Sequence, residues 1–126
     1  MKTREEEGTI ELGPILQEGR KSLKWLSGKQ RGADVRMAAK VSEAEARYER
    51  IRIVFPDETR SLTTSFVLGF FSQSFKRIAD ERGGGENLKE CFFNKFSIVN
   101  NVDSSKASII RDIEDGMRDY ILVEGI

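Results

Sequence analysis

The sequence contains no histidine, and this absence removes several kinds of catalytic and metal site. Without an imidazole, the chain of 126 residues can form neither a Ser-His-Asp triad nor a Cys-His pair. The single cysteine, Cys91, excludes both an intramolecular disulfide and a zinc ribbon within one chain. Carboxylates, lysine or tyrosine can still catalyse, but histidine is the commonest general acid–base. We therefore expect a protein that is not an enzyme and that uses no metal or cofactor.

Long apolar runs and a net charge are also lacking. No apolar run approaches the roughly 20 residues that span a bilayer, and the N-terminus MKTREEEG has no apolar signal-peptide core. The 21 basic and 21 acidic side chains cancel, so there is no overall basic surface for nucleic acid, although a local patch is not excluded. With a lone cysteine pointing to a reducing compartment, we expect a cytoplasmic protein that binds neither nucleic acid nor membranes.

The composition predicts one small domain over residues 1–126. Apolar residues make up 38% and charged residues 33% of the chain, which suits a single core under a well-charged surface. No internal repeat or linker divides the sequence. The charged residues 1–7 are expected to be disordered.

Apolar spacing predicts an α/β fold. Strands are expected where apolar or β-branched residues run or alternate, and helices where apolar residues recur every three or four positions. Alternation of the two predicts parallel pairing, in a sheet of about four mostly parallel strands covered by about three helices. The predicted strands are 9–16, interrupted at Gly13-Pro14, a short one at 23–26, then 51–55 and 96–100; the predicted helices are 33–50, 66–82 and 103–122, the last capped by Asp103, Ser104 or Ser105.

Three hydroxyl residues, Thr63, Thr64 and Ser65, precede the aromatic-rich helix. A helix start favours a hydroxyl that accepts a backbone N–H, and we expect capping to be the sole role of at least two of the three. One hydroxyl can instead project outward and accept a phosphate, because the helix dipole and free N–H groups favour negative charge there. A nucleophilic serine is excluded in practice, since no activating base and no Gly-x-Ser-x-Gly elbow is present.

A basic segment surrounds the only tryptophan, Trp25. Basic residues around an aromatic ring can contact a phosphate or a base, although a solvated hairpin anchored by Trp25 is the interpretation we favour. An alternative function follows from this segment: a small-ligand or nucleotide-binding module with phosphate contacts at Ser27, Gly28 and Arg36. The basic residues are Arg20, Lys21, Lys24, Lys29 and Arg31.

Two long runs, IRIVFPDETRSLTTSFVLGFF and FNKFSIVNNVDSSKASIIRDIEDGM, resemble the STAS-like family of unknown function. This family is a divergent relative of the STAS domains, named for sulfate transporters and anti-sigma factor antagonists. Its members have a buried strand, an acidic turn, a "sitsSF" segment opening a helix, and a later strand ending in Asn. Residues 62–66 match the middle motif and residues 98–100 the later strand, while Ser27-Gly28, Gly32 and Arg36 are similar to an SG…G…R pattern upstream.

The resemblance covers about residues 23–121 and implies a small α/β domain that works by binding partners. Anti-sigma factor antagonists dock on an ATPase of the histidine-kinase type and are switched off by phosphorylation of a serine at a helix start. When the motif of these antagonists is aligned with this chain, Ser65 takes the position of the phosphorylated serine. Thr64 then corresponds to the serine before it, and Thr63 to the aspartate of the motif. The resemblance therefore implies a non-enzymatic regulatory domain that takes part in partner switching with such an ATPase.

Overall fold

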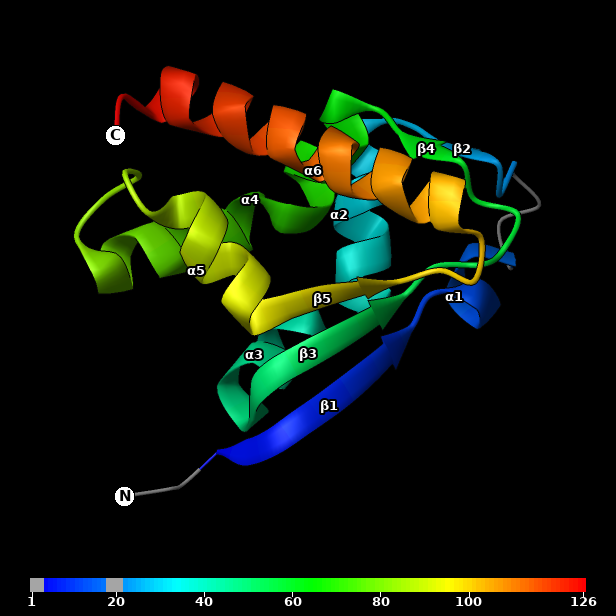
Figure 1. The fold of residues 1–126 in the computed structure, drawn as a ribbon, viewed down its shortest axis with the longest axis horizontal. Helices are drawn as coiled ribbons and strands as arrows, with labels where there is room; N and C mark the ends of the chain where they lie inside the picture. The colour runs from blue at the N-terminus through cyan, green and yellow to red at the C-terminus, as the bar shows by residue number, and fades with distance from the viewer. Residues whose placement is uncertain (1–3, 18–21) are drawn as a thin grey trace.

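The computed structural model describes residues 4–17 and 22–126 and shows a mixed α/β fold in which all paired strands are parallel (Figure 1). The α/β class and the parallel pairing predicted from the sequence are confirmed. The described elements are, in order, β1 (Glu5–Glu11), α1 (Gly13–Gln17), β2 (Trp25–Leu26), α2 (Lys29–Ala38), α3 (Val41–Arg47), β3 (Tyr48–Val54), β4 (Ser61–Leu62), α4 (Thr64–Arg82), α5 (Leu88–Lys95), β5 (Phe96–Val99) and α6 (Asp103–Glu124).

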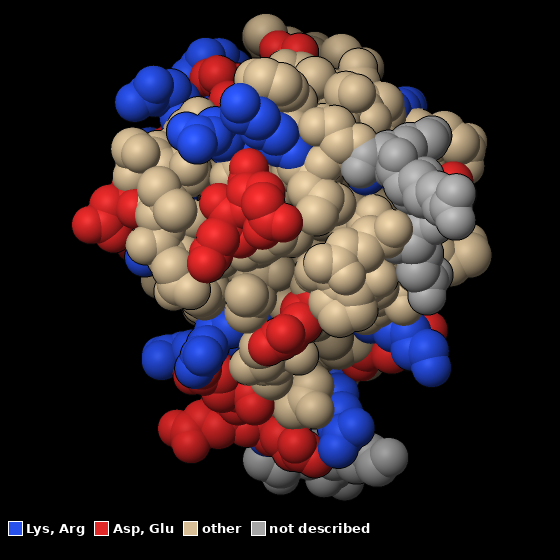
Figure 2. Space-filling model, turned by 90° about the vertical axis from the view of Figure 1, so that its right-hand side faces the viewer, with Lys and Arg blue, Asp and Glu red and all other residues tan. Residues whose placement is uncertain are grey.

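The main sheet has three strands in the order β1-β3-β5, with β1 at the edge far from α6 (Figure 1). Its residues alternate between a buried face, which holds Ile51 and Ile53 of β3, and a solvent-exposed face, which holds Arg52. On the exposed face Arg52 binds Glu7 of β1 at 3.3 Å. The lower part of the view in Figure 2 accordingly shows acidic and basic side chains next to one another. The helices therefore bury one face of this sheet and leave the other polar.

The remaining two described strands, β2 and β4, form a separate parallel pair instead of joining the main sheet. One edge of β4 meets β2, and the Thr63 N–H that follows it donates to the Leu26 carbonyl at 2.9 Å. On the other edge, the Leu62 N–H donates to an Asp112 carboxylate oxygen of α6 at 2.9 Å. The expected sheet of about four strands is therefore wrong, because α6 occupies the edge through which β4 would have to pair.

Helix α4 is the central element, as the aromatic spacing predicts. Its apolar side is fully buried and contacts aromatic rings of α5, β5 and α6, including Phe71 against Phe96 at 5.9 Å between ring centroids. The helix ends at Gly83, which adopts the left-handed conformation with φ of 83° that glycine accepts most readily. The buried aromatic residues of this core are Phe55, Phe66, Phe70, Phe71, Phe75, Phe92, Phe96 and Tyr120.

The single helix expected over 33–50 is instead two helices, α2 and α3, separated by a turn. Lys40 lies in the left-handed region with φ of 56° and precedes α3. In one continuous helix, Arg36 and Glu45 would be about 13.5 Å apart along the axis. The turn folds α3 back, so that these side chains form an ion pair of 2.8 Å. A tertiary contact has overridden a local pattern that favours helix throughout.

The N-terminal elements also differ from the prediction. Residues 5–7, expected to be disordered, belong to β1, where they pair with β3; residues 1–3 lie outside the described part. Gly13 and Pro14 begin the short helix α1 rather than interrupting a strand, since proline is accepted in a first helical turn. Helix α2 starts at Lys29, earlier than expected.

The C-terminal half adds one helix and changes one cap. Residues 88–95 form α5, which apolar spacing alone does not separate from the strand that follows. The predicted hydroxyl or carboxylate cap of α6 is wrong: its N-cap is Val102, which has no side-chain oxygen. Instead, the Asn100 side chain accepts a hydrogen bond from the Val102 N–H at 2.8 Å. With α1, the α2–α3 break and α5, the described residues hold six helices rather than about three.

Candidate functional site

The starts of α2 and α4 lie side by side, because each helix directly follows one strand of the β2–β4 pair (Figure 1). Gly28 precedes α2 and Thr63 precedes α4 as the N-caps. The hydrogen bond from the Thr63 N–H to the Leu26 carbonyl ties the two connections together. The structure thus brings together two segments that are separated by more than thirty residues in the sequence and that were each predicted as sites.

Two glycines let these helices touch backbone to backbone. A Cβ at Gly69 of α4 would overlap the Lys29 carbonyl oxygen, and a Cβ at Gly32 of α2 would overlap the Phe66 carbonyl oxygen. Such an approach excludes any side chain at either position. The first turns of α2 and α4 are therefore held at a fixed distance, and groups projecting from them form one rigid surface.

The three hydroxyls at the start of α4 have different surroundings. The Thr63 hydroxyl accepts a hydrogen bond from the Phe66 N–H at 3.2 Å, so Thr63 is the cap. The expectation that at least two of the three hydroxyls cap the helix is wrong, because among the described residues neither Thr64 nor Ser65 accepts such a bond. Thr64 is half-buried, whereas Ser65 is exposed and its hydroxyl has no hydrogen bond to any residue that the structure describes. Phe66 is fully buried and turns its ring into the core. The Ser65 hydroxyl is therefore accessible to solvent, whereas its neighbour Phe66 belongs to the core.

The start of α2 offers open backbone donors and a large apolar side chain. Gly28 has no side-chain oxygen to cap the helix, and its φ of 94° is one that glycine accepts readily. Ser27 and Lys29 on either side are exposed. Trp25 is 55% exposed, and the Lys24 ammonium lies 4.6 Å from the centroid of its ring. Of the predicted basic cluster, Arg20 and Lys21 lie outside the described residues.

Arg36, the third predicted phosphate contact, is an interior residue. It is only 4% exposed, and its guanidinium donates to the Phe70 carbonyl at 2.7 Å, the Ser74 hydroxyl at 2.8 Å and the Glu45 carboxylate at 2.8 Å. Burial lowers the pKa of Arg36, while the charge of Glu45 acts in the opposite direction. The side chain ties α2 to α3 and α4, and it presents no nitrogen to a ligand at the Ser27-Gly28 surface.

The structure therefore groups Ser27, Gly28, Thr63, Thr64 and Ser65 and separates Arg36 from them. Sequence patterns missed Glu45, the partner of Arg36. No local signal could have found it, since a glutamate in a helix usually faces solvent. Its role depends entirely on the turn before α3.

The described residues meet neither the requirements of a metal site nor those of a membrane-spanning helix. Within residues 4–17 and 22–126, no group of three or more histidine, cysteine, aspartate or glutamate side chains is placed to hold a metal ion. No helix in this part of the chain is long and apolar enough to cross a bilayer.

The chain matches no model of a protein family, and no curated protein or solved structure is significantly similar to it. Membership of the STAS-like family therefore stays a prediction from the motif residues. The function has to be inferred from the geometry of the surface at the starts of α2 and α4.

Proposed function

We propose that this chain is a STAS-like, non-enzymatic regulatory domain that docks on a protein partner through the surface at the starts of α2 and α4. This switch face is defined by Trp25, Ser27, Gly28, Thr64 and Ser65. The observation that carries the proposal is the exposed, unbonded Ser65 hydroxyl on the first turn of α4, next to the start of α2. The partner class is an ATPase or kinase of the histidine-kinase type, which the family resemblance implies.

The physical basis of a switch at Ser65 is electrostatic. Phosphorylation would add about −1.5 to −2 charges, which the first turns of two adjacent helices favour through their dipoles and free N–H groups. The domain itself would therefore tolerate the modification. A partner seated on the same surface would lose contact area and would meet a new dianion, so phosphorylation is expected to release it.

An exposed tryptophan favours a protein partner at this face. Large amphipathic side chains such as Trp25 dominate the energetics of many interfaces, where burial of the ring provides much of the binding energy. Trp25 is 55% exposed although it lies on a strand of the β2–β4 pair. A docked partner would cover it.

The alternative function, a nucleotide or small-ligand module in the Trp25–Arg36 segment, has less support. Its phosphate contact at Arg36 is occupied by Glu45, Ser74 and a carbonyl in the interior. Thermal-shift measurements with a panel of nucleotides test it, because a ligand at 100 times its Kd adds about 2.7 kcal/mol of stability. A shift abolished by Ser27→Asp would favour this alternative.

Binding to a candidate ATPase tests the regulatory function, with Ser65→Asp compared against Ser65→Ala. We expect Ser65→Asp to weaken binding by at least about tenfold, roughly 1.4 kcal/mol, and Ser65→Ala to leave it intact. Ser104→Asp is a matched control, since Ser104 is also an exposed serine at the second position of a helix, α6. Equal binding by Ser65→Asp and Ser104→Asp would reject the switch.

A further inference from the structure

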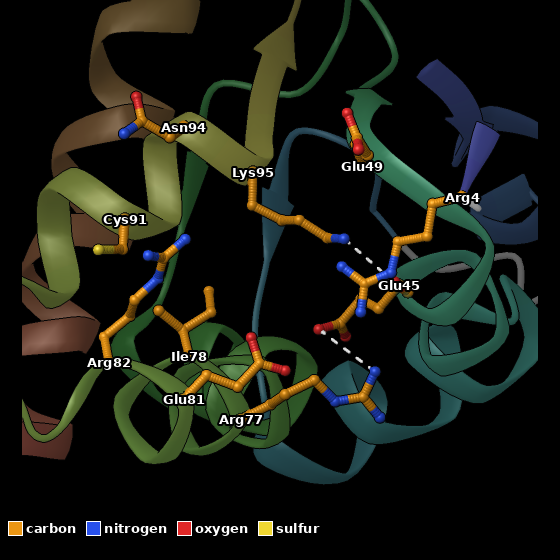
Figure 3. A pocket seen from close by; sticks show the side chains of 10 residues that line it. All are labelled: Arg4, Glu45, Glu49, Arg77, Ile78, Glu81, Arg82, Cys91, Asn94 and Lys95. Carbon is orange, nitrogen blue, oxygen red and sulfur yellow. Dashed lines mark hydrogen bonds and ion pairs between the residues drawn. The ribbon is translucent and has the colours of Figure 1, made fainter. Parts of the chain in front are cut away.

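A polar pocket opens between the C-terminal half of α4, helices α3 and α5, the start of β3 and Arg4, which precedes β1 (Figure 3). Its volume is about 270 Å³, just below the range of roughly 300–1,000 Å³ that is usual for ligand sites. Ser65 and Arg82 lie at opposite ends of α4, 17 residues or about 25 Å apart along the helix. The pocket is therefore remote from the switch face.

Lys95 contributes a half-buried positive charge to this pocket. Its ammonium donates to the backbone carbonyls of Glu45 and Tyr48, the former at 3.0 Å, and forms no ion pair with a described carboxylate. Burial, together with the charge of Arg4, lowers the pKa of Lys95. Two of the three ammonium N–H groups are used, which leaves one donor on a half-buried cation that faces the pocket (Figure 3).

Glu45 contributes an acceptor that is not satisfied. One carboxylate oxygen accepts hydrogen bonds from Arg36 and Ser74, both at 2.8 Å. The other carboxylate oxygen accepts no hydrogen bond from the residues that the structure describes. It is cut off from bulk solvent as well, because the Glu45 side chain is 99% buried. An Arg77 guanidinium nitrogen lies 4.0 Å from this oxygen, and the Arg77 side chain is 41% exposed. Buried acceptors are rarely left open in this way, and in Figure 3 this carboxylate points into the pocket.

The charges around the pocket select the kind of ligand. Arg4, Arg77 and Arg82 join Lys95 as cations, whereas Glu49 and Glu81 are the acids left once Glu45 is assigned to Arg36. Counted together with Arg36, which pairs with Glu45 behind the pocket wall, the lining carries a net charge of about +2, which matches a phosphate dianion better than a single carboxylate. Guanidinium groups suit the geometry of phosphate oxygens. The small volume leaves room for only a few further atoms.

We propose that this pocket binds a small hydroxylated phosphomonoester. Its phosphate is held by Lys95, Arg77 and Arg82, and a hydroxyl donates to the open oxygen of Glu45. To hold the phosphate, the Arg77 guanidinium turns away from Glu45, and the partial exposure of the Arg77 side chain permits this movement. This binding activity is independent of the switch face, and neither proposal requires the other.

Titration of the full chain with glycerol 3-phosphate, at constant ionic strength, tests the proposal by calorimetry and by amide chemical shifts. We expect saturable binding, with shifts concentrated in residues 77–82 and 91–95. Glycerol should not bind, and inorganic phosphate should bind at least about tenfold more weakly, because it brings no carbon-borne hydroxyl to Glu45. Equal affinity for inorganic phosphate would reject a phosphomonoester, and absence of saturable binding at millimolar concentration would reject the site.

Two variants connect binding to the pocket. Arg82→Gln and Lys95→Met should each weaken binding by about tenfold or more, since each removes a charge-assisted contact. Arg118→Gln, an exposed arginine on α6 outside the pocket, is the matched control and should bind like the natural chain. If Lys95→Met fails to fold, the exposed Arg82 still decides the question. Unchanged affinity in Arg82→Gln would overturn the proposal.

Discussion

Replacing Glu45 by glutamine should destabilise the fold strongly while leaving its shape almost unchanged. The Glu45 and Arg36 side chains are 1% and 5% exposed and 2.8 Å apart. Arginine stays protonated at any accessible pH, so the variant leaves a buried guanidinium without a counterion. Breaking a buried pair in this way costs about 3–5 kcal/mol. Because a domain is stable by only about 5–15 kcal/mol, a fifth or more of the stability would be lost.

Chemical denaturation followed by circular dichroism measures this loss, and thermal unfolding should show a fall in Tm on the order of 10 °C or more. The matched control is Glu5→Gln, which breaks the ion pair between Glu5 and Arg47. Both of those side chains are more than half exposed, and exposed pairs contribute about 0–1 kcal/mol. A Glu45→Gln loss no larger than that of Glu5→Gln would refute the reasoning.

The double variant Arg36→Met with Glu45→Leu separates charge from packing. It removes both buried charges and fills the space with apolar groups, which is often neutral or stabilising. We expect it to recover most of the stability lost by Glu45→Gln. A double variant as unstable as the single one would show that the hydrogen bonds to α4, rather than the charge balance, hold α2 and α3 in place.

Three further predictions concern the packing of α4 against α2, the cap of α4, and the contact between α6 and β4. Gly69→Ala should lose several kcal/mol in chemical denaturation, because overpacking costs about 1–3 kcal/mol even without a backbone clash, whereas Gly13→Ala, with 4.0 Å of clearance, should lose little. Thr63→Ala should lower the free energy of unfolding by about 0.5–2 kcal/mol, because it removes the capping hydroxyl. Thr63→Ser keeps a hydroxyl and should retain most of that stability. Burial raises the pKa of Asp112 above the ordinary 3.8, while the hydrogen bond from the Leu62 N–H acts in the opposite direction. Ionisation of Asp112 therefore lowers the free energy of unfolding. Relative to the Asp112→Asn variant, the natural chain should gain stability as the pH falls through the raised pKa toward 3.8. No change in that difference with pH would contradict the assignment.

Local patterns located the central elements because each carries its own signal. The aromatic spacing before Gly83 predicts α4, and the β-branched residues 51–54 predict most of β3. The hydroxyls before Phe66 predict a capped helix start, and Thr63 proves to be the cap. Each of these features depends on residues within a few positions of one another, so the sequence contains the whole cause.

Elements that depend on distant partners were missed. Helix α5 and the turn at Lys40 are not separated from their neighbours by composition. The β2–β4 pair stays apart from the main sheet because Asp112, 50 residues after Leu62, occupies its free edge. A local reading cannot weigh such a contact against strand pairing.

The sequence by itself determined the α/β class, the parallel strands, the aromatic core helix and the hydroxyl cap, because periodicity and capping act over one or two helical turns. Only the tertiary structure decided which polar side chains are exposed and free to contact a ligand or a partner. It exposed Ser65 and buried Phe66, and it enclosed Arg36 with Glu45. It also left Lys95 facing a pocket, in an ion pair with none of the described carboxylates. Burial and charge balance depend on what packs around a residue, and those neighbours come from distant parts of the chain.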